Sequence, residues 1–157
     1  MSASPLTSRC FWTSLVFAWV AVIFLPSIFI ALFGLSPAAA GEEVLSAVLE
    51  IADEVAPAAK LSFPLLFGGS LLLARRLGRD TGATLNALFA CIAALLALAL
   101  LPADLSRGFG VGLTGTRFDP ALLPIYLGSA AVAGLVFTSA ERRCHARQHH
   151  GEPSSTA

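Results

Sequence analysis

One cysteine and two histidines near the C-terminus come closest to the pattern of a metal site. His145 and His149 are four residues apart, which puts both imidazoles on one face of a helix, and Cys144 lies beside that face. Thiolate and imidazole groups are ligands that soft transition metals favour. Arginines crowd the same segment and a polar tail follows it, so we favour a solvated basic tail that contacts anionic lipid. We expect no bound metal here.

The other reactive side chains do not assemble into a catalytic or cofactor-binding set. All 3 histidines lie after Cys144, across the expected membrane from the acidic residues that cluster between Glu42 and Glu54. A serine–histidine–acid arrangement therefore cannot form. The glycine-rich stretch 108–115 lacks the lysine and the strand-to-helix setting of a phosphate-binding loop. We expect no catalytic residue and no cofactor.

Several residues inside the apolar segments are better suited to shaping helices than to catalysis. Proline removes a backbone donor and interrupts a helix, and glycine lets two helix backbones approach closely. Asn86 is the most polar uncharged residue well inside an apolar segment, and we favour an interhelical hydrogen bond for it over contact with a solute. The candidate helix-packing or cavity residues are Pro26, Pro64, Gly68, Gly69, Asn86, Tyr126 and Gly134.

Long apolar elements must position these residues. Of the 157 residues, 56% are hydrophobic and only 13% are charged, whereas soluble domains average about 25% charged residues. A membrane-spanning helix needs about 20 apolar residues. The sequence predicts an all-α integral membrane protein with four transmembrane helices, arranged as two antiparallel hairpins. Their expected ranges are 11–35, 57–77, 81–101 and 120–140. Because Pro64 and Gly68-Gly69 interrupt the second range, it could be a full span or a broken helix.

The segments between the expected spans differ in character. Residues 37–56 place apolar side chains at helical spacing opposite an acidic face, which predicts an amphipathic helix outside the cytoplasm. Residues 102–119 form a glycine-rich external loop, and residues 78–80 form a basic cytoplasmic turn. Residues 1–10 are the N-terminal segment, and residues 141–157 are a basic and then disordered tail.

The arginines predict the orientation. Seven of the 10 basic residues lie in the two terminal segments and at the turn after the second span, namely Arg9, Arg75, Arg76, Arg79, Arg142, Arg143 and Arg147. The other three are Lys60, Arg107 and Arg117. This asymmetry predicts a multi-pass protein of a bacterial-type inner membrane with both termini in the cytoplasm.

The same topology leads us to expect no disulfide among the 3 cysteines. It places Cys10 and Cys144 in the reducing cytoplasm and Cys91 inside a span.

The first apolar range has a second interpretation as a cleaved secretory signal. Ala38-Ala39-Ala40 follows it and resembles a cleavage site, but residues 11–35 greatly exceed the apolar core of a signal peptide, which is about 7–15 residues long. We therefore favour a retained span.

Function follows from these features only indirectly. Small-residue faces on three spans and an amphipathic helix without an obvious docking surface favour a non-enzymatic accessory or assembly subunit of a larger membrane complex. Its expected partners are membrane lipid and either a membrane protein or a second copy of the chain. A net charge of zero argues against nucleic acid.

Two alternatives stay open. One is a channel or carrier for a small neutral or apolar solute, with the prolines and glycines around a cavity and Asn86 and Tyr126 as polar contacts. The other is a membrane-bound redox or lipid-modifying enzyme, although no histidine lies inside a span to ligate haem.

Overall fold

The computed structural model describes residues 9–33, 45–46, 48–49, 52, 57–79, 81–100 and 122–150, and these residues contain helices and no strand. The helices are α1 (Arg9–Leu32), α3 (Pro57–Arg76), α4 (Ala83–Leu100) and α5 (Leu123–His150). The predicted all-α fold is thus confirmed for this part of the chain. The expected external loop 102–119 lies outside it, as do residues 1–8 and 151–157. Of the expected amphipathic helix 37–56, five residues are described, and Val48 and Ala52 among them are buried.

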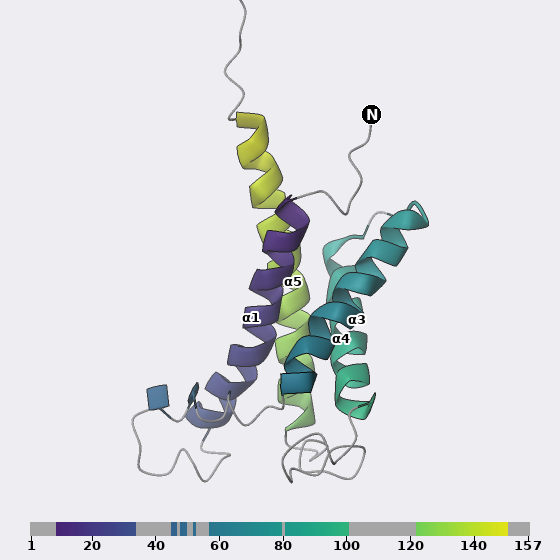
Figure 1. Ribbon diagram of the computed structural model, residues 1–157. Helices are drawn as coiled ribbons and strands as arrows, with labels where there is room; N and C mark the ends of the chain where they lie inside the picture. Colours follow the sequence, from purple (N-terminus) through teal and green to yellow (C-terminus); the bar gives the residue numbers. More distant parts are fainter. Residues whose placement is uncertain are drawn as a thin grey trace, which may run out of the picture.

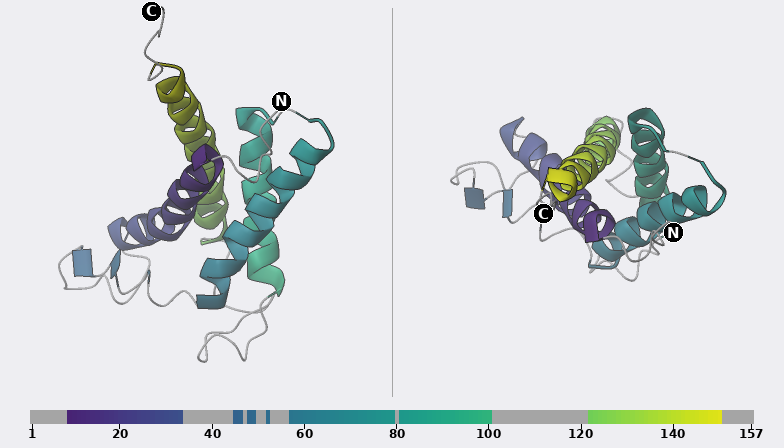
Figure 2. Two further views of the ribbon diagram at one scale, coloured as in Figure 1. Left: turned by 45° about the horizontal axis from the view of Figure 1, so that its top comes forward. Right: turned by 90° about the horizontal axis from the view of Figure 1, so that it is seen from above.

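Successive helices run in opposite directions, so the start of α1, the turn between α3 and α4, and the end of α5 lie at the same end of the bundle (Figure 1). We call this the arginine end, because it holds the seven arginines named above. Helix α5 packs most extensively against α1 and α4, and α3 closes the bundle by packing against α4 and, less extensively, α1. Figure 2 shows the α1–α5 and α3–α4 pairs from two further directions.

Two described helices are long and apolar enough to cross a membrane, namely α1 and residues Leu123–Gln148 of α5. Helix α4 contains a shorter apolar stretch, Ala83–Ala99. Helix α3 has 20 residues but carries Arg75 and Arg76 in its last turn.

A backbone motif ends α3 and makes the basic turn. Gly78 has a φ of 69°, a left-handed conformation that glycine adopts without a steric penalty. Its N–H donates to the Arg75 carbonyl over 3.0 Å, and the Arg79 N–H donates to the Ala74 carbonyl over 3.1 Å. These two bonds are the Schellman pattern that satisfies the last carbonyls of a helix. The turn that presents the arginines is therefore fixed by one glycine.

The core contains both aromatic rings in edge-on contact and buried small residues. The Phe137 ring of α5 meets the rings of Phe11 and Phe67 edge-on, with centroids 5.7 and 5.6 Å apart. Buried alanines of α4 and α5 bring those two backbones close together, and they are Ala90, Ala93, Ala94, Ala97, Ala130 and Ala133. The small-residue faces of these two helices therefore pack inside the chain.

The structure corrects the expectation that no disulfide forms. Cys10, near the start of α1, is bonded to Cys144 of α5, with their Cα atoms 5.5 Å apart. This separation lies within the usual range of about 4.4–6.8 Å. The expectation rested on a reducing compartment for Cys10 and Cys144 and on the placement of Cys91 inside a span. It overlooked that antiparallel α1 and α5 carry these distant residues to one place. Cys91 is a free thiol.

Candidate functional site

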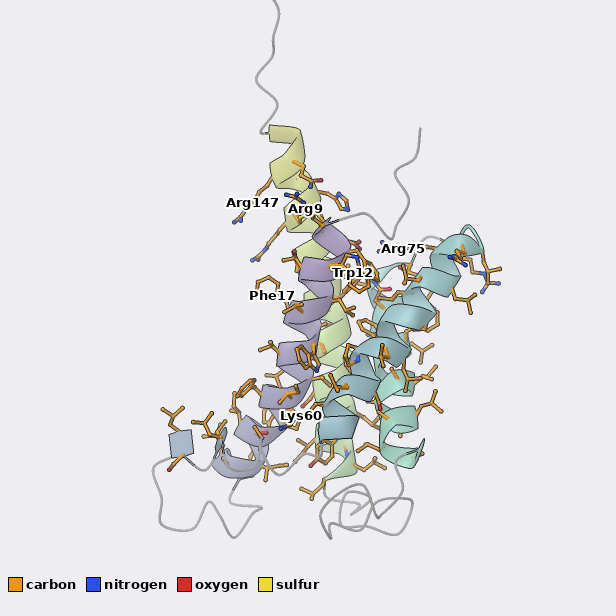
Figure 3. All side chains as sticks on the ribbon, viewed as in Figure 1. Arg9, Trp12, Phe17, Lys60, Arg75 and Arg147 are labelled. Atoms are coloured by element: carbon orange, nitrogen blue, oxygen red, sulfur yellow. A yellow bond between two sulfur atoms is a disulfide. The ribbon has the colours of Figure 1, made fainter. Side chains whose placement is uncertain are left out.

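A small cavity lies between the four helices, toward the end of the bundle opposite the arginine end, and we call it the central cavity. Its volume is about 70 Å³. Every helix contributes to its lining, which includes Pro26, Ser27, Lys60, Phe63, Ala97 and Tyr126. Lys60 lines this cavity and lies at the opposite end of α3 from Arg75 (Figure 3).

The size and lining of the central cavity limit what it could hold. One water needs about 10–15 Å³, and an apolar cavity of about 150 Å³ can hold benzene. A cavity of about 70 Å³ therefore suits a molecule of only a few non-hydrogen atoms. Most of the lining is apolar, and the polar side chains are those of Ser27, Lys60 and Tyr126. The Ser27 hydroxyl donates to the Ile23 carbonyl over 3.0 Å. Apolar side chains cannot replace the water around an ion, and a lysine repels positive charge, so this lining favours a neutral molecule over a cation.

Pro64 creates an interhelical hydrogen bond beside this cavity. Proline has no N–H, so the carbonyl of Lys60, four residues earlier in α3, loses its usual helical donor. The indole Nε1–H of Trp19 in α1 donates to that carbonyl instead, over 2.6 Å. The bond joins α1 to α3 at the level where the cavity begins. The proline thus supplies an acceptor that an unbroken helix would have used internally.

The residues singled out from the sequence lie in three different places. Pro26 and Tyr126 line the central cavity. Gly68 and Gly134 lie at helix contacts: a Cβ built on Gly68 would lie 3.0 Å from a Leu15 methyl group, and one on Gly134 would lie 2.6 Å from the backbone of α4. Gly69 faces outward, with no atom within 4 Å of such a Cβ. In the described residues, the prolines and glycines therefore do not surround one common cavity.

Asn86 lies at the α4–α5 contact and does not line the central cavity. Its Nδ2 donates to the Thr138 hydroxyl over 2.9 Å, and that hydroxyl donates to the Gly134 carbonyl over 3.0 Å. Both side chains are buried. This relay joins the two helices where Gly134 lets them approach. Within the described chain, the Asn86 Oδ1 and the hydroxyls of Ser14 and Ser129 are buried without a hydrogen-bond partner.

Arg75 joins three helices at the arginine end. Its Nη2 donates to both carboxylate oxygens of Glu141 in α5, each over 2.7 Å. Its guanidinium carbon lies 5.0 Å from the centroid of the Phe11 ring in α1, a cation–π distance. The sequence did not single out this pair, because Arg75 and Glu141 are far apart in the chain and each resembles an ordinary charged residue at a helix end.

The candidate metal ligands do not gather into a site in the described residues. The Cys144 sulfur is bonded to Cys10, so it is not available as a thiolate. His145 is exposed, and the side chain of His149 lies outside the described residues. Among the residues that the structure describes, no group of three metal-binding side chains occurs.

The outward face of α3 carries a ridge that we call the Gly69 ridge. It consists of Leu61, Leu65, Gly69 and Leu73, together with Leu77 directly after the helix. These residues are spaced four apart, and all five are exposed. Four leucines project from it, and the glycine leaves a gap in the middle. Inside a helix, glycine is less stable than alanine by about 0.5–1 kcal/mol. Nothing in the described chain makes use of that gap.

No known protein family, curated protein or solved structure matches the chain.

Proposed function

We propose that the chain is a four-span protein of a bacterial-type inner membrane, with the arginine end in the cytoplasm. Large apolar side chains face outward on all four helices, for example Phe17, Leu65, Leu88 and Leu135, which are 56%, 74%, 53% and 45% exposed. A soluble protein rarely exposes this much apolar surface, whereas lipid would cover it. Retention of α1 is supported by its part in the core, where Phe11, Leu15 and Ala18 are buried.

Within that membrane we propose a non-enzymatic role as an accessory or assembly subunit, and the Gly69 ridge carries this proposal. Gly68 and Gly134 lie at helix contacts within the chain, where a neighbouring helix already occupies the space beside them. Gly69 alone interrupts the leucine ridge with a gap that a second helix could enter. The expected occupant is a transmembrane helix of a partner protein that packs against α3.

A pull-down from native membranes in mild detergent tests this role. We expect the tagged protein to retain a partner at a fixed ratio, as measured by mass spectrometry and native mass. Gly69→Leu fills the gap and should remove that partner. Gly128→Leu is the matched control, because Gly128 is also exposed in a helix with open space at its Cβ position. A clean monomer, or a partner retained equally by Gly69→Leu, would contradict the proposal.

The central cavity favours a second candidate, a channel or carrier for a small neutral or apolar solute. Liposomes containing the protein should then pass urea or glycerol faster than empty liposomes, as measured by stopped-flow light scattering. Ala97→Leu would fill the cavity and abolish the increase. Gly69→Leu is the control, because Gly69 lies outside the lining. Equal rates for protein-containing and empty liposomes would rule out this route for both probes.

A further inference from the structure

A groove runs along the outer surface between α1 and α5, separate from the central cavity and from the Gly69 ridge. Its volume is about 580 Å³. Its long wall is apolar and includes Phe17 of α1 with Val132, Leu135 and Val136 of α5. At the arginine end it is bordered by Arg143 and Arg147. We call it the α1–α5 groove.

The charge of this groove is confined to one end and has one sign. Arg143 and Arg147 are four residues apart on α5, so they share a helix face, and both are exposed. No carboxylate lines the groove in the described residues. Glu141, the acidic residue nearest in sequence, is held by Arg75 on another face of α5. In Figure 3, Arg147 and Phe17 project from the same side of the α1–α5 pair.

Uncharged polar side chains lie between the basic end of the groove and its apolar wall. The hydroxyl-bearing side chains of Thr13 and Ser139 line the groove as well. The Thr13 hydroxyl donates to the Arg9 carbonyl over 2.9 Å. Cys144 also borders the groove at the basic end, where its Cα lies 5.5 Å from the Cα of Cys10 in α1. The order along the groove is therefore cationic, hydroxylic and then apolar.

We propose that the α1–α5 groove binds one anionic phospholipid. The phosphate lies against the guanidinium groups of Arg143 and Arg147, the ester region passes Ser139, and one acyl chain follows Phe17 and Leu135. A free phosphate matches only the basic end of this groove, and a partner helix of apolar side chains matches only the wall. Anionic lipid is abundant in the cytoplasmic leaflet, where the proposed orientation places the arginine end. The inference rests on the proposed membrane location and is independent of the partner protein.

Nanodiscs of two compositions test the groove and the membrane location separately. The full-length protein is incorporated into phosphatidylcholine discs with and without phosphatidylglycerol of the same acyl chains. Incorporation into both kinds of disc tests the membrane location. Lipids retained after release are then counted by native mass spectrometry. We expect one retained phosphatidylglycerol, favoured over phosphatidylcholine by about tenfold or more, the magnitude expected for two arginines near a lipid surface.

Paired variants assign the selectivity to these two arginines. Arg143→Gln with Arg147→Gln should lower the preference for phosphatidylglycerol to near equality. Arg76→Gln with Arg142→Gln removes the same charge from the arginine end outside the groove and should leave the preference unchanged. Ser139→Trp should block the groove and reduce retained lipid without changing the net charge.

Four results would overturn the inference. They are equal retention of the two lipids by the unaltered protein, equal loss in both arginine pairs, full displacement of phosphatidylglycerol by inorganic phosphate, and a native mass that shows a second copy of the chain in place of lipid. Failure to enter either disc would instead contradict the membrane location.

Discussion

Gly134 is the residue whose replacement the structure forbids most clearly. A Cβ at this position would lie 2.6 Å from both the Ala87 Cα and the Asn86 carbonyl oxygen. These are backbone atoms of α4, so the two helices would have to move apart and weaken the hydrogen bond from Asn86 to Thr138.

We therefore expect Gly134→Ala to destabilise the protein by roughly 1–3 kcal/mol, the usual effect of overpacking a core. Thermal unfolding in detergent, followed by circular dichroism, measures it. Gly69→Ala is the matched control, because the same methyl group meets open space there. It should be neutral or raise stability by up to about 1 kcal/mol. Equal effects of the two changes would mean that α4 and α5 do not approach at Gly134.

Pro64 and Trp19 act as a pair, and their coupling is measurable. Trp19→Phe removes the indole N–H and leaves the Lys60 carbonyl without that donor, which should cost about 1–2 kcal/mol. Pro64→Ala adds a backbone N–H that can reach the same carbonyl inside α3. In the Pro64→Ala background, Trp19→Phe should therefore cost much less. A double-mutant cycle of unfolding free energies gives the difference, and strict additivity would show that the proline does not create the acceptor.

At the scale of elements, the sequence specified which helices could form better than it specified their contacts. The apolar ranges, the proline positions and the small-residue spacing predicted helices close to α1, α3 and α4. Helix α5 begins near the expected start of the fourth span but continues to His150, well beyond the expected end at residue 140. Small-residue spacing indicates that a helix can pack closely against another helix, but it does not indicate which helix that is. Gly134 packs against Asn86 and Ala87 of α4, whereas no described residue of another helix lies within 4 Å of a Cβ built on Gly69.

The same limit explains the missed contacts at the arginine end. Cys10 and Cys144 are 134 residues apart, and only the direction and crossing of α1 and α5 bring them together. Pairing was judged from the expected compartment, which carries no geometric information. The ion pair of Arg75 and Glu141 depends in the same way on the order of the helices around the bundle.

That ion pair should connect α3 to α5 energetically. The two side chains are only 23% and 15% exposed, so water screens their attraction less than at an open surface. We expect Glu141→Gln to destabilise the protein by about 1 kcal/mol in the native background and to have little effect after Arg75→Met. Arg76→Met is the control, because Arg76 is exposed at the next position. We expect the effect of Glu141→Gln on the free energy of unfolding to be only slightly smaller at high salt than at low salt. If Glu141→Gln is coupled no more strongly to Arg75→Met than to Arg76→Met, Arg75 contributes through its contact with Phe11 alone.

At the scale of the whole molecule, two features of the arginine end argue for opposite sides of the membrane. The arginines favour the cytoplasm, whereas disulfides persist in oxidising compartments and are usually transient in the cytoplasm. Both features belong to the same end, because Cys10 lies beside Arg9 and Cys144 lies beside Arg143. The proposed orientation is compatible with the disulfide only if the pair forms under oxidising conditions and is open in the resting cell.

Counting thiols in cells decides between the two orientations. With the arginine end in the cytoplasm, rapid acid quenching followed by denaturing alkylation with a mass-tagged maleimide should label all 3 cysteines in untreated cells. After exposure to a thiol oxidant only Cys91, the free cysteine, should be labelled, so Cys91 is an internal standard in both samples. A Cys10→Ser variant should keep two tags under either condition, because Cys144 then lacks its partner. A single tag in untreated cells would show that the pair is permanently oxidised, and it would place both termini outside the cytoplasm despite the arginines.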